Sequence, residues 1–191
     1  MGKLQDFQKL VIANASHVKG LKAGDVAPDF TLPNAFGKMI SLSEVVKSSH
    51  VILKFYRGEW CPICNLDLRA IQASLPQIKA LGAVVLAISP QKPDDALTLT
   101  EKNHLDFEVL SDADQQVIKD YRLQFDPGIG YHKRRDLTLL NADGSKTLPV
   151  PATFIINRQR IITTAHVEAN YTERMLPSEI IKTLLDEKHK T

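Results

Sequence analysis

Apolar residues along the chain follow two alternating spacings, one typical of buried strands and one typical of helices. Short, mostly apolar runs rich in strand-forming residues predict strands at 51–56, 83–88, 107–110, 153–156 and 161–167. Apolar residues at helical spacing predict helices from the cysteines to Gly82, over 93–103, around 117–121 and over 177–185. Strands that alternate with helices and end in a strand pair predict an α/β fold with a sheet of mixed direction.

The first residues carry an apolar pattern of their own. One face of a helix is predicted there by the spacing of Leu4, Phe7, Leu10, Val11 and Ala15. We expect this helix to pack on the body of the protein or on a partner subunit. The remaining length and the 43% hydrophobic content suit one globular domain. The predicted organisation is therefore an N-terminal helix, 1–20, followed by a single domain, 21–191.

Charge and hydropathy exclude several classes of partner. The formal net charge is only +2, with no long run of either sign, which argues against a nucleic-acid partner. The longest apolar runs, such as 83–88, are far too short to cross a bilayer, so no membrane partner is predicted. Charged and amide side chains interrupt residues 1–22, and the continuous apolar core of a secretory signal is missing. These observations predict a cytoplasmic protein.

The two cysteines, Cys61 and Cys64, lie three positions apart. They are too close in sequence to join distant parts of a fold, which excludes a structural disulfide framework. Two thiols are too few for a four-cysteine zinc site, and the six histidines show no paired ligand spacing. We therefore predict no metal.

The segment Trp60-Cys-Pro-Ile-Cys64 connects a predicted strand directly to a predicted helix. Both thiols should lie in the first helical turn, where unpaired N–H groups and the helix dipole favour the reactive thiolate. Pro62 suits the first helical position because its missing N–H would have had no partner there. Sulfurs at positions i and i+3 can face each other and form a disulfide with little backbone motion. The alternative is a buried helix face that holds two cysteines without chemistry.

Three stretches resemble the peroxiredoxin family, specifically its alkyl hydroperoxide reductase and bacterioferritin-comigratory-like branches. They are Gly24–Leu32, Phe55-Tyr56 with Cys61-Pro-Ile-Cys64, and Pro151–Ile156. The resemblance extends over about residues 21–185 and implies a thioredoxin-like fold, with a central mixed β-sheet flanked by helices and an extra N-terminal helix. Matched residue by residue, Cys64 falls on the family's peroxidatic cysteine, and Cys61 falls where the family usually has threonine.

This resemblance implies a thiol-dependent peroxidase that acts on hydrogen peroxide or organic hydroperoxides. The Cys64 thiolate would attack the O–O bond and become a sulfenic acid, and Cys61 would condense with it to a disulfide. Thioredoxin, glutaredoxin or glutathione would reduce that disulfide by exchange. No metal or organic cofactor is needed. Proteins of this fold often self-associate, and the apolar N-terminal helix offers a surface for a homodimer.

The sequence departs from the family pattern at residues expected to shape the site. Arg57 occupies the family's proline position, and Pro151 stands where peroxiredoxins commonly present an arginine. Arg57 and Arg69 are the candidate replacements for that arginine. Pro151 instead resembles the proline that faces the cysteine pair in thioredoxin, so a cis bond is predicted at Val150–Pro151. Trp60 is expected to pack beside the site.

These departures leave two further functions open. The first is a C-x-x-C thiol:disulfide oxidoreductase in which Cys61 is the attacking thiol. The second is a noncatalytic redox sensor or metal-carrying module that uses the same pair. Outside the motif, His132 with the basic residues 133–135 is interpreted either as an anion-binding patch or as a solvated loop.

Overall fold

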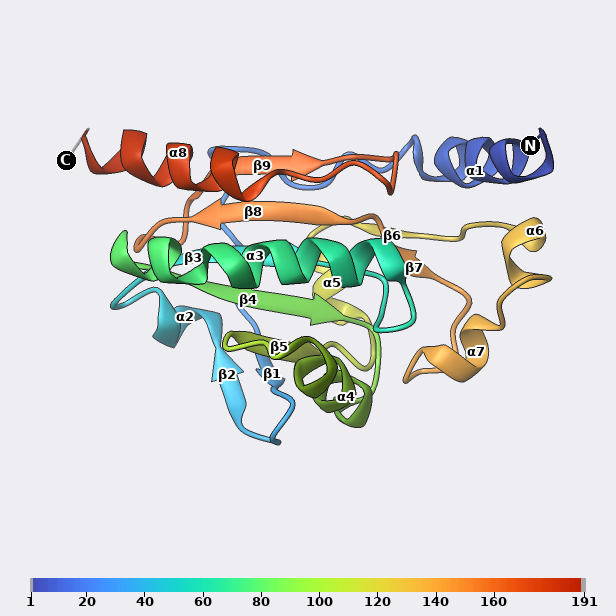
Figure 1. Cartoon of the computed structure of the whole chain (residues 1–191), viewed down its shortest axis with the longest axis horizontal. Helices are drawn as coiled ribbons and strands as arrows, with labels where there is room; N and C mark the ends of the chain where they lie inside the picture. Colours follow the sequence, from blue (N-terminus) through green and yellow to red (C-terminus); the bar gives the residue numbers. More distant parts are fainter. Residues whose placement is uncertain (1, 190–191) are drawn as a thin grey trace.

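A five-stranded mixed sheet forms the centre of the protein in the computed structural model, which describes residues 2–189 (Figure 1). In spatial order the strands are β5 (Glu108–Ser111), β4 (Ala83–Ser89), β3 (His50–Phe55), β8 (Ala152–Ile156) and β9 (Ile162–Val167). Strands β3, β4 and β5 are parallel, whereas β8 is antiparallel to both of its neighbours. The predicted α/β fold with mixed sheet direction is confirmed, and β3 is its central strand.

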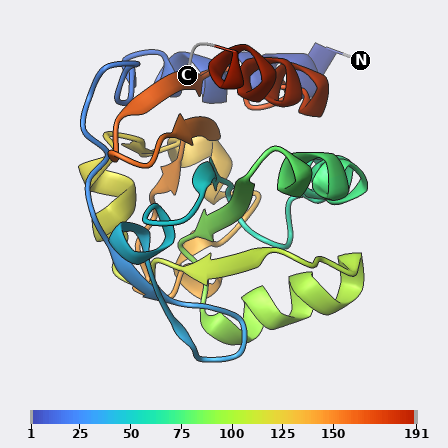
Figure 2. The ribbon, with the colours of Figure 1, turned by 90° about the vertical axis from the view of Figure 1, so that its left-hand side faces the viewer.

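Three helices cover the face of the sheet that carries the cysteines. They are α3 (Pro62–Ala80), α4 (Pro93–Asn103) and α8 (Pro177–Lys188). Side chains at helical spacing along α3, including Leu68 and Ile71, pack with Ile52 and Val85 of the sheet in one buried cluster. Figure 2 shows α3 and α4 on one side of the sheet and α2 and α5 on the other. Helix α3 runs through Pro76 as one element, so the division predicted at this proline does not occur.

The opposite face is covered by short helices and by the extended segment that follows the first helix. The elements on this face are the hairpin β1 (Thr31–Pro33) and β2 (Met39–Ser41), with α2 (Leu42–Val45) and α5 (Gln116–Asp120). Three aromatic rings, Phe55, Tyr121 and Phe154, lie with centroids 5.1 to 6.0 Å apart at its centre. Alternate residues of β3 face this cluster, and those between them, Lys54 included, face α3.

A third apolar cluster lies beyond one end of the sheet. Its elements are α1 (Gly2–Ala15), α6 (Ile129–His132), α7 (Leu137–Leu140), β6 (Gln124–Phe125) and β7 (Leu148–Pro149). The predicted N-terminal helix is confirmed as α1, which buries Val11 and stacks Phe7 on Tyr131 at 5.7 Å. The boundary between helix and domain at residue 20 stays a prediction. None of the helices in the described part of the chain has the length and apolar character needed to cross a membrane.

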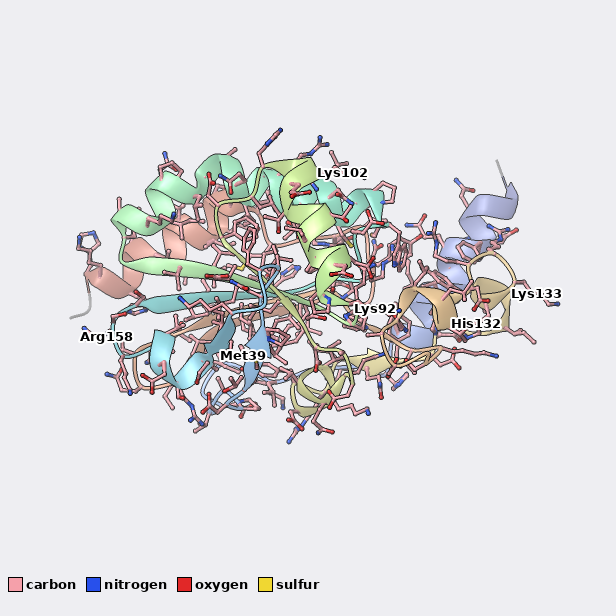
Figure 3. All side chains as sticks on the ribbon, turned by 90° about the horizontal axis from the view of Figure 1, so that it is seen from below. Met39, Lys92, Lys102, His132, Lys133 and Arg158 are labelled. Carbon is pink, nitrogen blue, oxygen red and sulfur yellow. The ribbon has the colours of Figure 1, made fainter. Side chains whose placement is uncertain are left out.

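The basic segment that follows α6 packs on aromatic rings. The guanidinium of Arg134 lies 4.1 Å from the centroid of Phe7, and that of Arg135 lies 4.4 Å from the centroid of Trp60. His132 contacts the carboxylate of Asp126 at 2.7 Å, and Figure 3 shows it near α1. The interpretation of this segment as a solvated loop is therefore wrong, because its arginines join α1 to the cysteine motif.

The predicted cis bond at Val150–Pro151 is also wrong, since every peptide bond between residues 2 and 189 is trans. The N–H of Val150 donates to the carbonyl of Leu123 at 2.8 Å, and Ala152 already pairs with Phe55 in the sheet. The chain thus passes extended from β7 into β8 with no tight turn that would favour the cis form.

Leu68 tests whether the packing of α3 on the sheet holds the fold together. Its side chain is fully buried between α3 and the sheet, whereas Leu66, two residues earlier on the same helix, is 58% exposed. We expect Leu68→Ala to lower the free energy of unfolding by about 2–5 kcal/mol, because it leaves a cavity. Leu66→Ala should change it by about 0.5 kcal/mol or less. Urea denaturation measures both, and equal losses would contradict this description of the core.

Candidate active site

The loop from β3 to α3 places the two cysteines at the start of the helix. Cys61 is the N-cap of α3, and Pro62 occupies the first helical position, as predicted. Gly58 makes the turn before them with φ +155°, and its carbonyl accepts the Cys61 N–H at 3.1 Å. A Cβ at Gly58 would collide with the indole nitrogen of Trp60, so glycine allows the indole to lie against the loop.

Asn65 anchors this loop to the neighbouring helix. Its amide nitrogen donates to the carbonyls of Glu59 and Cys61 at 2.6 and 2.9 Å. Its amide oxygen accepts from Asn103 of α4 at 2.7 Å. Asn65 thus fixes the backbone on both sides of Trp60, and no motif in the sequence pointed to it.

The two sulfur atoms lie 2.6 Å apart as free thiols, and both side chains are almost fully buried. Cys64 donates from its thiol to Cys61 Sγ, and the backbone N–H of Cys64 donates to the same sulfur at 3.4 Å. The predicted facing of residues i and i+3 is present. Such a pair needs little movement to form a disulfide.

Cys61 Sγ accepts a further hydrogen bond from Arg57 Nη2 at 3.3 Å. Arg57 is buried, and its guanidinium lies 4.2 Å from the centroid of Tyr171 and 5.6 Å from that of Trp60. The hydrogen bond from the Cys64 thiol lowers the pKa of Cys61 to about 5, with Arg57 adding to the shift and burial opposing it. Cys61 is therefore the thiolate at rest.

Cys64 has the opposite electrostatic environment. Burial, followed by the hydrogen bond to Cys61 and the charge of that sulfur, raises the pKa of Cys64 well above its ordinary value. Arg57 and Arg174 oppose this shift, and Arg174 Nη2 lies 3.8 Å from Cys64 Sγ. Each sulfur thus has its own arginine, and the pair holds one proton, on Cys64.

Arg174 belongs to the loop between β9 and α8, and the sequence did not indicate it. Its Nε lies 3.4 Å from Asp67 Oδ2, and Asp67 in turn pairs with the buried Lys54 at 3.0 Å. The sequence signal for this cluster is Lys54, a charged residue in an otherwise apolar central strand. No local pattern marks Arg174, because only the fold brings residue 174 to residue 64.

The other residues predicted to shape the site fall into two groups. Arg57 contacts a thiol, and Trp60 packs beside the site between the arginines at positions 57 and 135, as expected. Arg69 is not the replacement arginine: it lines a surface groove of α3 and α4 together with Leu66 and Lys102. Pro151 is buried immediately before β8. Among residues 2–189, no group of three or more histidine, cysteine or acidic side chains could hold a metal ion.

Known proteins resemble this chain in both sequence and fold. Peroxiredoxin Bcp of Escherichia coli (strain K12) is 35% identical over 101 residues, which cover 53% of this chain and 64% of that protein, less than two thirds of its length. The peroxidoxin BcpB structure from Mycobacterium tuberculosis superposes with a TM-score of 0.70, at 22% identity, over 90% of this chain and 99% of that one. For PrxQ of Xylella fastidiosa the TM-score is 0.73, at 17% identity, over 89% and 99%.

The structural matches confirm the thioredoxin-like fold that the resemblance implied. The model of the AhpC/TSA family matches residues 23–165, which is more than half of the chain and includes both cysteines. The predicted family is therefore confirmed, and this chain belongs to the AhpC/TSA family.

Proposed function

We propose that the protein is a thiol-dependent peroxidase in which Cys64 attacks the hydroperoxide and Cys61 resolves the product. The observation that carries the proposal is the contact of 2.6 Å between the two sulfurs at the start of α3, in a chain of the AhpC/TSA family. Cys64 is taken as the attacking sulfur because it matches the peroxidatic position of the peroxiredoxin motif. Hydrogen peroxide and small organic hydroperoxides are the proposed substrates.

The shared proton gives Cys61 a role in the first step. At rest the proton lies on Cys64, so attack requires its transfer to Cys61 along the existing S–H···S hydrogen bond. The Cys64 thiolate then displaces the distal oxygen's partner from the O–O bond and becomes a sulfenic acid. The Cys61 thiol protonates the leaving oxygen as an alcohol or water, which regenerates the Cys61 thiolate beside the new sulfenic acid.

Resolution follows from the same geometry. The Cys61 thiolate attacks the sulfenic sulfur of Cys64, a disulfide forms, and hydroxide leaves as water after protonation. Two electrons and two protons from an external dithiol, or from two molecules of glutathione, restore the pair through a mixed disulfide. Thioredoxin, glutaredoxin or glutathione would serve, all of them reductants of the cytoplasm.

A second candidate function rests on the environment of Cys61. Three donors converge on its sulfur, from Arg57 and from the thiol and backbone N–H of Cys64. A resting thiolate at the first cysteine of C-x-x-C is what a thiol:disulfide oxidoreductase uses to attack a disulfide substrate. This function predicts that the reduced protein cleaves insulin disulfides, and failure to do so would remove it.

Single cysteine variants distinguish the two functions. Trp60 is the only tryptophan and contacts the site, so its fluorescence should report oxidation by hydrogen peroxide or cumene hydroperoxide in stopped flow. We expect Cys61→Ser to remain oxidisable, to accumulate a trappable sulfenic acid on Cys64, and to fail to form the disulfide. Cys64→Ser should lose the fast reaction.

The opposite pattern would assign attack to the other sulfur. If Cys64→Ser reacted with peroxide at the wild-type rate and Cys61→Ser did not, Cys64 could not be the peroxidatic residue. A rate no higher than that of a free thiol in every form would remove the peroxidase proposal.

A pH titration tests the resting state of the pair. The pKa of Cys61 is lowered to about 5, so its thiolate should be present at neutral pH and should be protonated as the pH falls through about 5. We expect the ultraviolet absorbance of one thiolate in the reduced protein to follow this titration. It should be absent from Cys61→Ser, in which only the Cys64 thiol remains. A wild-type protein without thiolate at neutral pH would contradict the proton assignment.

A further inference from the structure

Lys54 is a fully buried cation in the central strand of the sheet. Its side chain is 1% exposed, and the other residues from 51 to 55 are apolar. The ammonium contacts both oxygens of Asp67, at 3.0 and 3.1 Å, and Thr153 Oγ1 of the neighbouring strand at 3.1 Å. These three contacts match the three donors of a protonated lysine.

Asp67 connects Lys54 to the sulfur of Cys64. The same Oδ2 that faces Lys54 lies 3.4 Å from Arg174 Nε, and Arg174 Nη2 lies 3.8 Å from Cys64 Sγ. Arg174 Nη1 donates to the carbonyls of Tyr171 and Glu173, which fixes the guanidinium from the side of its own loop. The contacts therefore run from β3 through α3 to the loop before α8 and end at the sulfur.

The charges in this cluster do not cancel. Lys54 and Arg174 are cations and Asp67 is the one anion among them, which leaves one net positive charge beside Cys64. Without Lys54, the Asp67 carboxylate would neutralise Arg174, and the field of Arg174 at the sulfur would largely vanish. Burial lowers the pKa of Lys54 and the Asp67 carboxylate opposes that shift, so the lysine and the carboxylate act as one unit.

Stability alone does not account for this pair. Replacing a buried ion pair by apolar side chains of similar volume is often neutral or stabilising, because both charges lose their hydration on burial. A central strand whose neighbours are Val, Ile, Leu and Phe would fold readily with another apolar residue at position 54. The geometry points to a function for the charge.

We propose that Lys54 neutralises Asp67 so that the positive charge of Arg174 acts on Cys64 and stabilises its thiolate. Lys54 and Asp67 are then positioning residues, and Arg174 is the group that contacts the reacting sulfur. The inference rests on the proposed function, in which Cys64 forms a thiolate before it attacks. It assigns to a lysine of β3 a task for which the sequence offers no arginine at Pro151.

The test measures the pKa of Cys64 directly, in a Cys61→Ser background, by the ultraviolet absorbance of the thiolate. The charged side chains that face Cys64 in this background are Arg57 and Arg174, with Lys54 and Asp67 behind them. Lys54→Met removes one positive charge and keeps a similar shape. We expect it to raise the pKa of Cys64 by about one unit, which is a tenfold lower thiolate fraction at a fixed pH below that pKa.

A second substitution separates charge from packing. In Lys54→Met with Asp67→Asn, Arg174 alone again leaves one net positive charge, so the pKa of Cys64 should return toward its value in the background variant. A merely structural role for the pair predicts no such return. If Lys54→Met does not fold, the double variant is compared with Asp67→Asn alone, and loss of Lys54 should again raise the pKa of Cys64 by about one unit.

Lys182→Met is the matched control, because Lys182 pairs with Asp186 at 3.0 Å on α8 but is 78% exposed. It should leave the titration of Cys64 unchanged. An unshifted titration in folded Lys54→Met, or equal titrations for the double variant and Asp67→Asn, would overturn the proposal. The readout needs no peroxide, so it is distinct from failure of the peroxidase function, which the stopped-flow rates decide.

Discussion

One shared proton between two buried sulfurs is the interaction on which the site depends. At 2.6 Å, with no water around them, Cys61 and Cys64 cannot both be charged, because like charges at this distance in a buried site repel strongly. One sulfur must be the donor and the other the acceptor. The N-cap position of Cys61, which receives the Cys64 N–H, decides that Cys61 is the acceptor at rest. The two cysteines therefore differ chemically, although they sit in the same helical turn.

A buried thiolate requires compensation, and it comes from parts of the chain that are remote in sequence. Arg57 lies between Tyr171 and Trp60, and Trp60 is covered in turn by Arg135. The segment of Arg135 is held by α6, on which α1 packs. The first helix is thus connected to the cysteines through stacked cationic and aromatic side chains. Such contacts exclude water and strengthen the electrostatic effect of Arg57 on Cys61.

The parts of the structure that follow local rules could be predicted from the sequence. The strands and helices of the sheet layer were found to within a few residues, because apolar periodicity is a property of each segment alone. The helix from Pro93 to Asn103 was found at its observed limits. The same reasoning placed Cys61 and Cys64 in the first turn of α3. It could not find Arg174 or Asn65, whose contacts depend on how separate elements pack. It was wrong at Pro151 because the trans bond there follows from the pairing of β8 with β3, which no local signal reveals.

The departures from the peroxiredoxin pattern become consistent with one another once the charges are placed. A proline at position 151 removes the cation that the family presents from β8, and a cysteine at position 61 introduces a second sulfur that must itself be stabilised. Two sulfurs need two cations, and Arg57 and Arg174 reach them from different loops, one on each side of the pair. Arg57 could not occupy its position if the family's proline were kept there. The substitutions at 57, 61 and 151 are therefore best understood as one coupled change, from a single thiolate held by one arginine to a proton-sharing pair held by two.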